Sequence, residues 1–501
     1  MFSFKTKPFA KQLEALNKSV DATSFALHME QGTGKTKVAI DTAASHYQRG
    51  TIAGVVIVAP NGVQTGWIKD QIPDHLPDNI PRICAEWNRN RPKKIEVLFK
   101  PGIELRFLAI NYEALATKAG QDLVNRFLSA YRCLLVCDES HRIKNHKAQA
   151  SKFLHQIKGK AILRRTLTGT PAAESPLDLY SQFYFLNPSI LGFGSFTAFK
   201  AHYAVLEPPT SNLVRGIMRK LVQKYGEAKA AKMAPQLVAR DKDGFPRYRN
   251  VDQLTTTIHP HSFRCLRTEC VDLPGKVYEK RYVELNRVQR ATYESLRDNF
   301  LAEIEGGLVT APLAMTRLVR MQQVVGGFLP DEEGRLHPLG DSNPKLQALL
   351  DIAEDFPGKL IIWARFTAEL DLISDALEEA HGPHSVARYW GDIDKDHRAE
   401  NKRRFIEDAS CRFWVAQPRA GGTGVDGLQH AAHTVVYFSN EFSLTSRLQS
   451  EDRADRIGQD KTVVIIDLEA EDTLDQKVIT ALRAKKNVAD QITGDHIKEW
   501  I

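Results

Sequence analysis

The chain contains a series of short, unbroken apolar runs, each followed by small or polar residues and then by a stretch that reads as helix. Unbroken runs rich in β-branched residues are typical of strands that are covered on both faces of a parallel sheet. In such a sheet, ligands bind at the carboxyl ends of the strands. The pattern therefore predicts an α/β fold whose functional residues follow the runs at 25–27, 54–59, 106–110 and 134–137, with a further strand at 165–171 that itself ends in small polar residues.

The first of these runs leads into Met-Glu-Gln-Gly-Thr-Gly-Lys-Thr at residues 29–36, which precedes a helix-like stretch at 37–47. The two glycines let the backbone turn its N–H groups toward phosphate oxygens, Lys35 can reach the β and γ phosphates, and Thr36 can ligate magnesium. Met29 stands where the usual motif has glycine, which fits the helicase-type variant of this loop. The expected nucleotide-binding residues here are Gln31, Gly32, Thr33, Gly34, Lys35 and Thr36.

An acid pair follows the run at 134–137. Asp138 would hold magnesium, usually through water, and Glu139 would orient and deprotonate the attacking water. Paired acids after an apolar strand, in the same domain as a phosphate-binding loop, predict an ATP-hydrolysing site. The next run ends in Thr168 and Thr170, which could couple the nucleotide to a bound strand.

Length and composition limit what surrounds this site. With 501 residues, 43% of them hydrophobic and 26% charged, the chain suggests two to four globular domains. The formal net charge of +7 permits a polyanionic partner but equally suits a basic soluble surface. The six cysteines form no C-x-x-C pair, and no apolar run approaches a membrane span. We therefore expect an intracellular soluble protein, cytoplasmic if it comes from a prokaryote or its virus.

Taken in order, the motifs of the chain resemble those of superfamily-two helicases of the Swi/Snf type. The phosphate-binding loop, V-V-I-V-A-P at 55–60, D-E-S-H at 138–141 and L-T-G-T-P at 167–171 resemble the first motor lobe of that family. Residues 359–366, 420–426 and 449–459 are similar to its fourth, fifth and sixth motifs. The resemblance implies a DNA-dependent ATPase that uses ATP and magnesium, built as a minimal motor without accessory reader domains.

The same resemblance implies a domain order of two RecA-like parallel-sheet lobes with helical protrusions and a C-terminal brace helix. We expect residues 1–190 to form the first, ATP-binding lobe and residues 191–275 a helical protrusion or linker insert. Residues 276–472 would form the second lobe with its own protrusion, and residues 473–501 the brace helix and tail. Residues 212–239 read as basic amphipathic helix, for which we favour a solvated or packing face over a dedicated DNA grip.

Further site residues come from the second half and from outside the loop. Arg453 and Arg456 are spaced i and i+3, so on a helix they would face the same way and could act as arginine fingers. Gln12 could read the adenine edge, and Gly424, Asp426 and Gln449 are expected near the nucleotide. The nucleic-acid contacts implied by the resemblance are Pro60, Asn61, Asn111, Tyr112, Lys144, Asn145, Arg365, Gly421 and Gly422.

The function expected from these features is ATP-driven translocation along double-stranded DNA that remodels DNA structures or protein–DNA complexes. Two alternatives remain open at this stage. The chain could be a strand-separating DNA or RNA helicase, or an ATP-dependent clamp that rearranges a partner protein on DNA.

Overall fold

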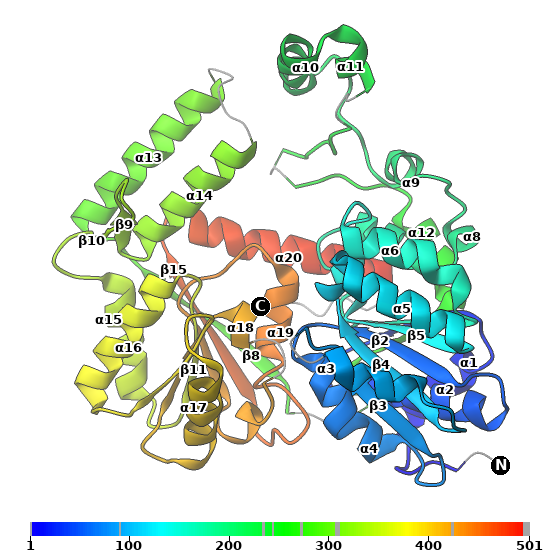
Figure 1. The fold of residues 1–501 in the computed structure, drawn as a ribbon. Coiled ribbons are helices and arrows are strands. Elements are labelled where there is room, and N and C mark those ends of the chain that lie inside the picture. The colour runs from blue at the N-terminus through cyan, green and yellow to red at the C-terminus, as the bar shows by residue number, and fades with distance from the viewer. Residues whose placement is uncertain are drawn as a thin grey trace. The chain divides into compact units, whose positions relative to one another are not determined.

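The computed structural model describes residues 3–89, 92–232, 236–242, 245–270, 274–305, 311–421 and 425–493. The chain divides into two compact units, each built on one parallel sheet (Figure 1). Of the described residues, unit 1 comprises those within 3–206, 238–270 and 485–493, and unit 2 comprises those within 207–237 and 274–484. This architecture confirms the predicted fold class of two RecA-like parallel-sheet lobes.

The sheet of unit 1 has seven strands in the order β3-β4-β2-β5-β6-β1-β7, and every neighbouring pair is parallel. The apolar runs of the sequence lie in this sheet, and the run at 54–59 coincides with β2. The strands are β1 (Ser24–Met29), β2 (Gly54–Ala59), β3 (Arg82–Glu86), β4 (Leu105–Asn111), β5 (Cys133–Asp138), β6 (Leu163–Leu167) and β7 (Ser262–Cys265).

Helices cover both faces of this sheet, which explains why its strands are apolar on both sides. Val56 and Val58 of β2 pack in a core with helices α5, α6 and α7, while Val55 and Ile57 pack in a second core with α1 and α2. The helices of unit 1 are α1 (Ala10–Ser19), α2 (Lys35–Gln48), α3 (Val63–Gly66), α4 (Ile72–His75), α5 (Lys118–Ala130), α6 (Gln149–Ile157), α7 (Leu179–Leu186), α8 (Pro188–Leu191), α9 (Phe196–Tyr203) and α12 (Val251–Ile258).

The edge strand β7 comes from a part of the sequence that we expected to form a helical insert or linker. Phe263 and Cys265 of β7 are buried in the core of unit 1, and β7 pairs with β1 in register from Ala26 opposite Ser262. Segment 262–265 therefore extends the first sheet, because its alternating buried residues fill the open edge beside β1. Helices α10 (Asn212–Tyr225) and α11 (Glu227–Lys232) carry the basic amphipathic pattern of the same region.

The sheet of unit 2 has six parallel strands in the order β12-β13-β11-β14-β15-β8. Its strands are β8 (Lys276–Val283), β11 (Leu360–Trp363), β12 (Val386–Tyr389), β13 (Phe413–Ala416), β14 (Thr434–Tyr437) and β15 (Val463–Ala470). One face packs on α15 (Pro344–Asp355) and α16 (Thr367–His381), and the other face packs against Phe405 of α17 (Lys395–Glu407). The first lobe's layered arrangement is thus repeated.

Unit 2 also carries the helical protrusion that the resemblance predicts. It consists of α13 (Arg287–Glu305) and α14 (Ala311–Val325), followed by the antiparallel pair β9 (Phe328–Pro330) and β10 (Leu336–Pro338). Two shorter helices, α18 (Pro418–Gly421) and α19 (Leu444–Glu451), follow β13 and β14. The expected brace helix is α20 (Leu474–Thr493), which begins in unit 2 and whose residues from Lys485 are grouped with unit 1. Within the described part of the chain, no helix is both long and apolar enough to cross a bilayer.

Candidate functional site

The turn between β1 and α2 in unit 1 is a glycine loop. Gly32 and Gly34 have φ of +80° and +84°, a backbone region that residues with a Cβ rarely adopt. The hydroxyl of Thr33 donates to the carbonyl of Glu30 at 2.7 Å, which closes the loop on itself. Lys35 is the first residue of α2, so the free N–H groups of the helix N-terminus follow the loop directly. This local geometry suits an anion with several oxygens.

Gln12 of α1 holds this loop from the side. Its Nε2 donates to the carbonyl of Thr33 at 3.1 Å, and its Oε1 accepts from the backbone N–H of Phe9 at 3.0 Å. A Cβ at Gly34 would lie 2.1 Å from this Nε2, so the close approach requires glycine. The side-chain amide of Gln12 still has one N–H and one lone pair beyond these bonds, which an adenine edge could use.

The acid pair lies at the carboxyl end of β5, facing the loop. Lys35 Nζ lies 3.6 Å from Glu139 Oε1, and Lys35, Asp138 and Glu139 are all less than a tenth exposed. Glu139 adopts the left-handed region, with φ 51° and ψ 54°. Strained backbone of this kind is concentrated at functional sites. The sheet therefore brings together a buried ammonium and two buried carboxylates that are about 100 residues apart in the sequence.

Two aromatic side chains fix Asp138. Trp67 Nε1 donates to Asp138 Oδ2 at 2.8 Å, and the Tyr112 hydroxyl donates to the carbonyl of Asp138 at 2.6 Å. Trp67 opens a π-helical turn at Trp67–Gln71, a local geometry that often occurs at functional sites. Sequence reasoning missed Trp67, because nothing in its own segment points to a residue 71 positions away.

The two neighbouring carboxyl groups have pKa values shifted in opposite directions. Burial and the charge of Glu139 raise the pKa of Asp138. Burial also raises the pKa of Glu139, but the charge of Lys35 and hydrogen bonds from His141 and Gln31 outweigh it and hold that pKa below its usual range. Glu139 is thus the carboxylate that stays ionised, which a proton acceptor for water must be.

A second set of bonds joins the acid pair to the end of β6. His141 Nδ1 lies 3.4 Å from Glu139 Oε2 and 3.1 Å from Thr168 Oγ1, and Thr168 Oγ1 accepts from the backbone N–H of Thr170 at 3.1 Å. His141 thus connects Glu139 to Thr168, while the predicted coupling of Thr168 and Thr170 to a bound strand stays a prediction. His141 stands beside the acids in the sequence, which is the signal that could have singled it out.

A further contact with the loop comes from β7 and the turn that follows it. The carboxylate of Glu30 accepts from the backbone N–H of Arg267 at 2.8 Å, and Arg264 lies 3.4 Å from the same carboxylate. An added Cβ at Gly32 would meet the side chain of Arg267 at 3.9 Å. Segment 264–267, which sequence reasoning treated as a link between lobes, thus also lines the loop.

The residues expected to contact nucleic acid occupy different environments. Pro60 and Tyr112 are buried, and the Tyr112 hydroxyl is engaged by Asp138, so its role in the structure is to support the acid pair. Asn111 Oδ1 accepts from the backbone N–H of Ala114 at 2.8 Å. Asn61 and Asn145 are exposed, Lys144 and Arg365 are partly exposed, and Gly421 ends α18, while Gly422 and Gly424 lie outside the described residues.

In unit 2, Arg453 and Arg456 converge on one carboxylate. Arg453 Nη1 lies 3.3 Å from Asp426 Oδ1, and Arg456 also forms an ion pair with Asp426. The expectation that both arginines lie on a helix is wrong, because α19 ends at Glu451 and both residues follow in turns. Gln449 lies in the last turn of α19, and its carbonyl accepts from Arg453 Nε at 3.3 Å. Shared contact with Asp426, and not helical spacing, brings the two guanidinium groups together.

The residues of unit 1 fit a nucleoside triphosphate with magnesium. Gly34 leaves no room for a Cβ beside Gln12, the helix N-terminus follows the loop, and Thr36 and Asp138 offer the oxygen ligands that magnesium prefers. Among the described residues there is no cluster of three or more histidine, cysteine or acidic side chains that could enclose a metal ion. Magnesium in phosphate sites is bound mostly through phosphate and water, so a magnesium ion here would not need a cluster of three protein ligands.

Unit 1 carries a phosphate-type loop and an acid pair at the ends of strands in an all-parallel sheet, and unit 2 is built on a second parallel sheet. These features define a two-lobe P-loop protein of the RecA-like class. The family comparisons specify the class further. The SNF2-related domain model matches residues 16–325, and the helicase conserved C-terminal domain model matches residues 344–458. The chain therefore belongs to the SNF2-related family of superfamily-two helicase-like proteins, which confirms the resemblance found in the sequence.

Individual relatives are distant and mostly much longer than this chain. Protein CHROMATIN REMODELING 4 of Arabidopsis thaliana is 22% identical over 518 residues, which cover 97% of this chain and 21% of that protein. Chromodomain-helicase-DNA-binding protein 1-like of Danio rerio is 23% identical over 482 residues, covering 92% of this chain and 41% of its own length. The Sulfolobus solfataricus SWI2/SNF2 ATPase core in complex with dsDNA is 21% identical, with a TM-score of 0.41, coverage of 98% of this chain and of 94% of its own. The chain thus spans less than half the length of these two curated relatives.

Proposed function

We propose that this protein is a DNA-dependent ATPase that uses ATP hydrolysis to move along double-stranded DNA. The observation that carries the proposal is the buried arrangement of Lys35, Asp138 and Glu139 facing the glycine loop. Membership of the SNF2-related family supports ATP use and action on DNA. In the first step, backbone N–H groups of the loop and the N-terminus of α2 bind the phosphates, and Lys35 turns from Glu139 to the β and γ phosphates.

Binding of the phosphates changes the environment of the acid pair. Once Lys35 binds the phosphates, it no longer pairs with Glu139, and His141 is the basic neighbour that Glu139 keeps. Glu139 can then accept a proton from the attacking water. Trp67 and Tyr112 hold Asp138 in place for metal binding together with Thr36. When bound, magnesium neutralises phosphate charge and orients the terminal phosphate.

Unit 2 would supply the remaining positive charge. We assign Arg453 and Arg456 the role of arginine fingers, with Asp426 holding them until they engage the phosphates. Hydrolysis then requires both lobes, since one carries the phosphate loop and the other the fingers. We propose that the lobes close when the fingers engage the phosphates and reopen after hydrolysis. Repeated cycles would move the DNA-contacting residues of one lobe relative to those of the other, and so move the motor along DNA.

The DNA contacts assigned to this motor are polar and backbone groups that meet phosphates. The candidates with accessible side chains are the exposed Asn61 and Asn145 and the partly exposed Lys144 and Arg365. Phosphate contacts read charge and spacing, so binding would depend strongly on salt and little on base sequence. We assign duplex DNA as the track because none of these positions offers an aromatic wedge that could unstack bases.

ATPase assays with duplex DNA, single-stranded DNA, forked DNA and RNA test the assignment directly. We expect duplex DNA to stimulate hydrolysis most, and an ATP-dependent displacement of a third strand from a triplex without separation of a tailed duplex. Unwinding of the tailed duplex, or stimulation by single strands alone, would favour a strand-separating helicase. Stimulation that needs a protein as well as DNA would favour a clamp that rearranges that protein.

A further inference from the structure

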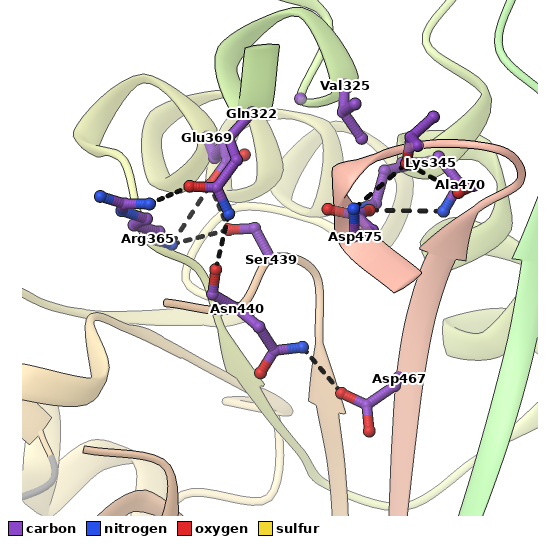
Figure 2. Close-up of polar contacts among 12 residues, drawn as sticks. Gln322, Val325, Lys345, Arg365, Glu369, Ser439, Asn440, Asp467, Ala470 and Asp475 are labelled. Carbon is purple, nitrogen blue, oxygen red and sulfur yellow. Dashed lines mark hydrogen bonds and ion pairs between the residues drawn. The ribbon is translucent and has the colours of Figure 1, made fainter. Parts of the chain in front are cut away.

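Gln322 of α14 is a buried amide that joins three parts of unit 2 (Figure 2). It is 4% exposed, its Nε2 donates to the carbonyl of Asn440 at 3.0 Å, and its Oε1 accepts from the guanidinium of Arg365. Arg365 follows β11 and Asn440 follows β14, so one side chain of the protrusion holds the ends of two neighbouring strands. Nothing in its sequence position pointed to this role.

We propose that Gln322 is a positioning residue that couples the DNA-facing Arg365 to the segment carrying Arg453 and Arg456. This inference rests on the proposed function, in which Arg365 contacts a phosphate and the two arginines act in hydrolysis. It adds a specific residue, outside every expected site, through which DNA binding and hydrolysis influence each other.

The backbone of Arg365 is held independently of its side chain. Its N–H donates to Ser439 Oγ at 2.8 Å, and its carbonyl accepts from Gln417 Nε2 at 3.1 Å. Ser439 in turn donates to the fully buried Glu369 at 2.5 Å. With the backbone fixed in this way, the guanidinium is the part of Arg365 that can exchange partners. It lies over the ring of Phe366 and donates to Gln322.

A continuous set of bonds leads from Asn440 to α19. Asn440 Nδ2 donates to Asp467 Oδ1 at 2.8 Å, and Arg447 of α19 donates to Asn440 Oδ1 at 2.8 Å. Arg447 also binds both oxygens of Asp467, at 2.6 and 3.0 Å, and its Nε donates to Glu451 at 2.7 Å. Glu451 is the last residue of α19, two positions before Arg453.

Binding of DNA to Arg365 would change these contacts. A DNA phosphate that binds Arg365 competes with Gln322 for the same guanidinium, and a charged acceptor is the stronger one. Gln322 then loses the partner of its buried oxygen, which is costly unless the amide and the Asn440 segment rearrange. Asn440 is bonded to Asp467 and Arg447, so such a rearrangement reaches α19 and the arginines after it. Differential contact of this kind is what an energetic coupling between two sites requires.

The variant Gln322→Leu removes both hydrogen bonds with little change in volume and tests the coupling in the full-length protein. We expect basal ATPase activity and the KM for ATP to stay within about twofold of the wild type, while stimulation by duplex DNA falls about fivefold or more. Binding provides a second readout, because coupling is reciprocal. A non-hydrolysable ATP analogue should change the Kd for duplex DNA in the wild type, and change it less in Gln322→Leu.

Gln289→Leu is the matched control. Gln289 of α13 is fully buried, and its Nε2 donates to the carbonyl of Val324 at 3.0 Å, so it also ties a glutamine amide to α14. It is bonded to neither Arg365 nor Asn440 in the described structure. Gln289→Leu should lower the melting temperature as much as Gln322→Leu does and keep the stimulation by DNA.

A second variant tests the next link. Asn440→Ala keeps the carbonyl that Gln322 binds and removes the bonds to Asp467 and Arg447, while the pair Asp467–Arg447 remains. It should reduce stimulation as Gln322→Leu does, and the double variant should reduce it no further, since both act on one path.

The outcomes separate the inference from the proposed function. If duplex DNA does not stimulate the wild type, the proposed function fails. If DNA stimulates the wild type and Gln322→Leu to the same extent, the coupling role of Gln322 is wrong although the motor assignment stands. Equal loss of stimulation in Gln322→Leu and Gln289→Leu would show general loosening of the protrusion, and would also overturn the inference.

Discussion

Lys35 Nζ lies 3.6 Å from Glu139 Oε1, and the two side chains are 10% and 12% exposed. Each side chain compensates the buried charge of the other. In the proposed mechanism Lys35 binds phosphate and Glu139 activates water, so nucleotide binding and hydrolysis depend on different members of the pair. Substitutions of the two residues should therefore have different effects.

Lys35→Ala should abolish ATP binding at ordinary concentrations, because the phosphates lose their main cation and the buried Glu139 loses its ammonium partner. Glu139→Gln should bind ATP at least as well as the wild type, since Lys35 is no longer attracted to a carboxylate. Its turnover should fall by about 10²- to 10⁴-fold, the usual contribution of a general base. Fluorescent-nucleotide binding and single-turnover hydrolysis measure both effects. Full activity in either variant would refute the assignment.

Gly34→Ala should remove nucleotide binding through the loop geometry alone. Residue 34 has φ +84°, and a Cβ would lie 2.1 Å from Gln12 Nε2, so Gln12 must leave Thr33 or the loop must shift. Gly50→Ala is the control: residue 50 has φ +66° and no heavy atom within 4 Å of an added Cβ. Both variants should lose about 1–2 kcal/mol of stability from left-handed strain. Only Gly34→Ala should lose ATP affinity, as measured by equilibrium dialysis.

Arg456→Ala should lower the rate of DNA-stimulated hydrolysis by about 10³-fold or more with little change in ATP affinity, because an arginine finger acts on charge that develops in the transition state. Arg456 gives a cleaner test than Arg453. Its side chain is 30% exposed, whereas Arg453 is 4% exposed and donates to the carbonyl of Val425 at 2.8 Å. Arg453→Ala should therefore also lower the melting temperature. An unchanged turnover rate in Arg456→Ala would exclude it as a finger.

The stability of unit 1 should depend on pH through His155. Burial lowers the pKa of His155 to about 4, and its Nε2 lies 3.0 Å from the carbonyl of Ser181. The unfolded chain binds the proton at the ordinary pKa of about 6.5, so this contribution to stability is present above pH 6.5 and is lost as the pH falls toward 4. Urea unfolding of the wild type at pH 7 and pH 5 should show a larger loss than that of His155→Gln. The same loss in both proteins would assign the pH dependence to other groups.

The sequence by itself determined the elements whose geometry is local. β2 coincides with the apolar run at 54–59, because an unbroken β-branched run can be covered on both faces only in a parallel sheet. The phosphate-type loop was predictable because the positive φ angles of Gly32 and Gly34 depend on their lacking a Cβ. Asp138 and Glu139 were predictable as a pair at a strand end, since the carboxyl ends of parallel strands meet at one edge.

Only the tertiary structure decided which distant groups complete each site. Trp67 Nε1 donates to Asp138 Oδ2, the Tyr112 hydroxyl donates to the Asp138 carbonyl, and β7 pairs with β1 at the edge of the sheet. In unit 2, Asp426 and not helical periodicity brings Arg453 and Arg456 together, and Gln322 links Arg365 to Asn440. These contacts join residues that are tens to hundreds of positions apart. Their partners are selected by burial and hydrogen bonding in the folded chain, which leave no periodic or local signal in the sequence.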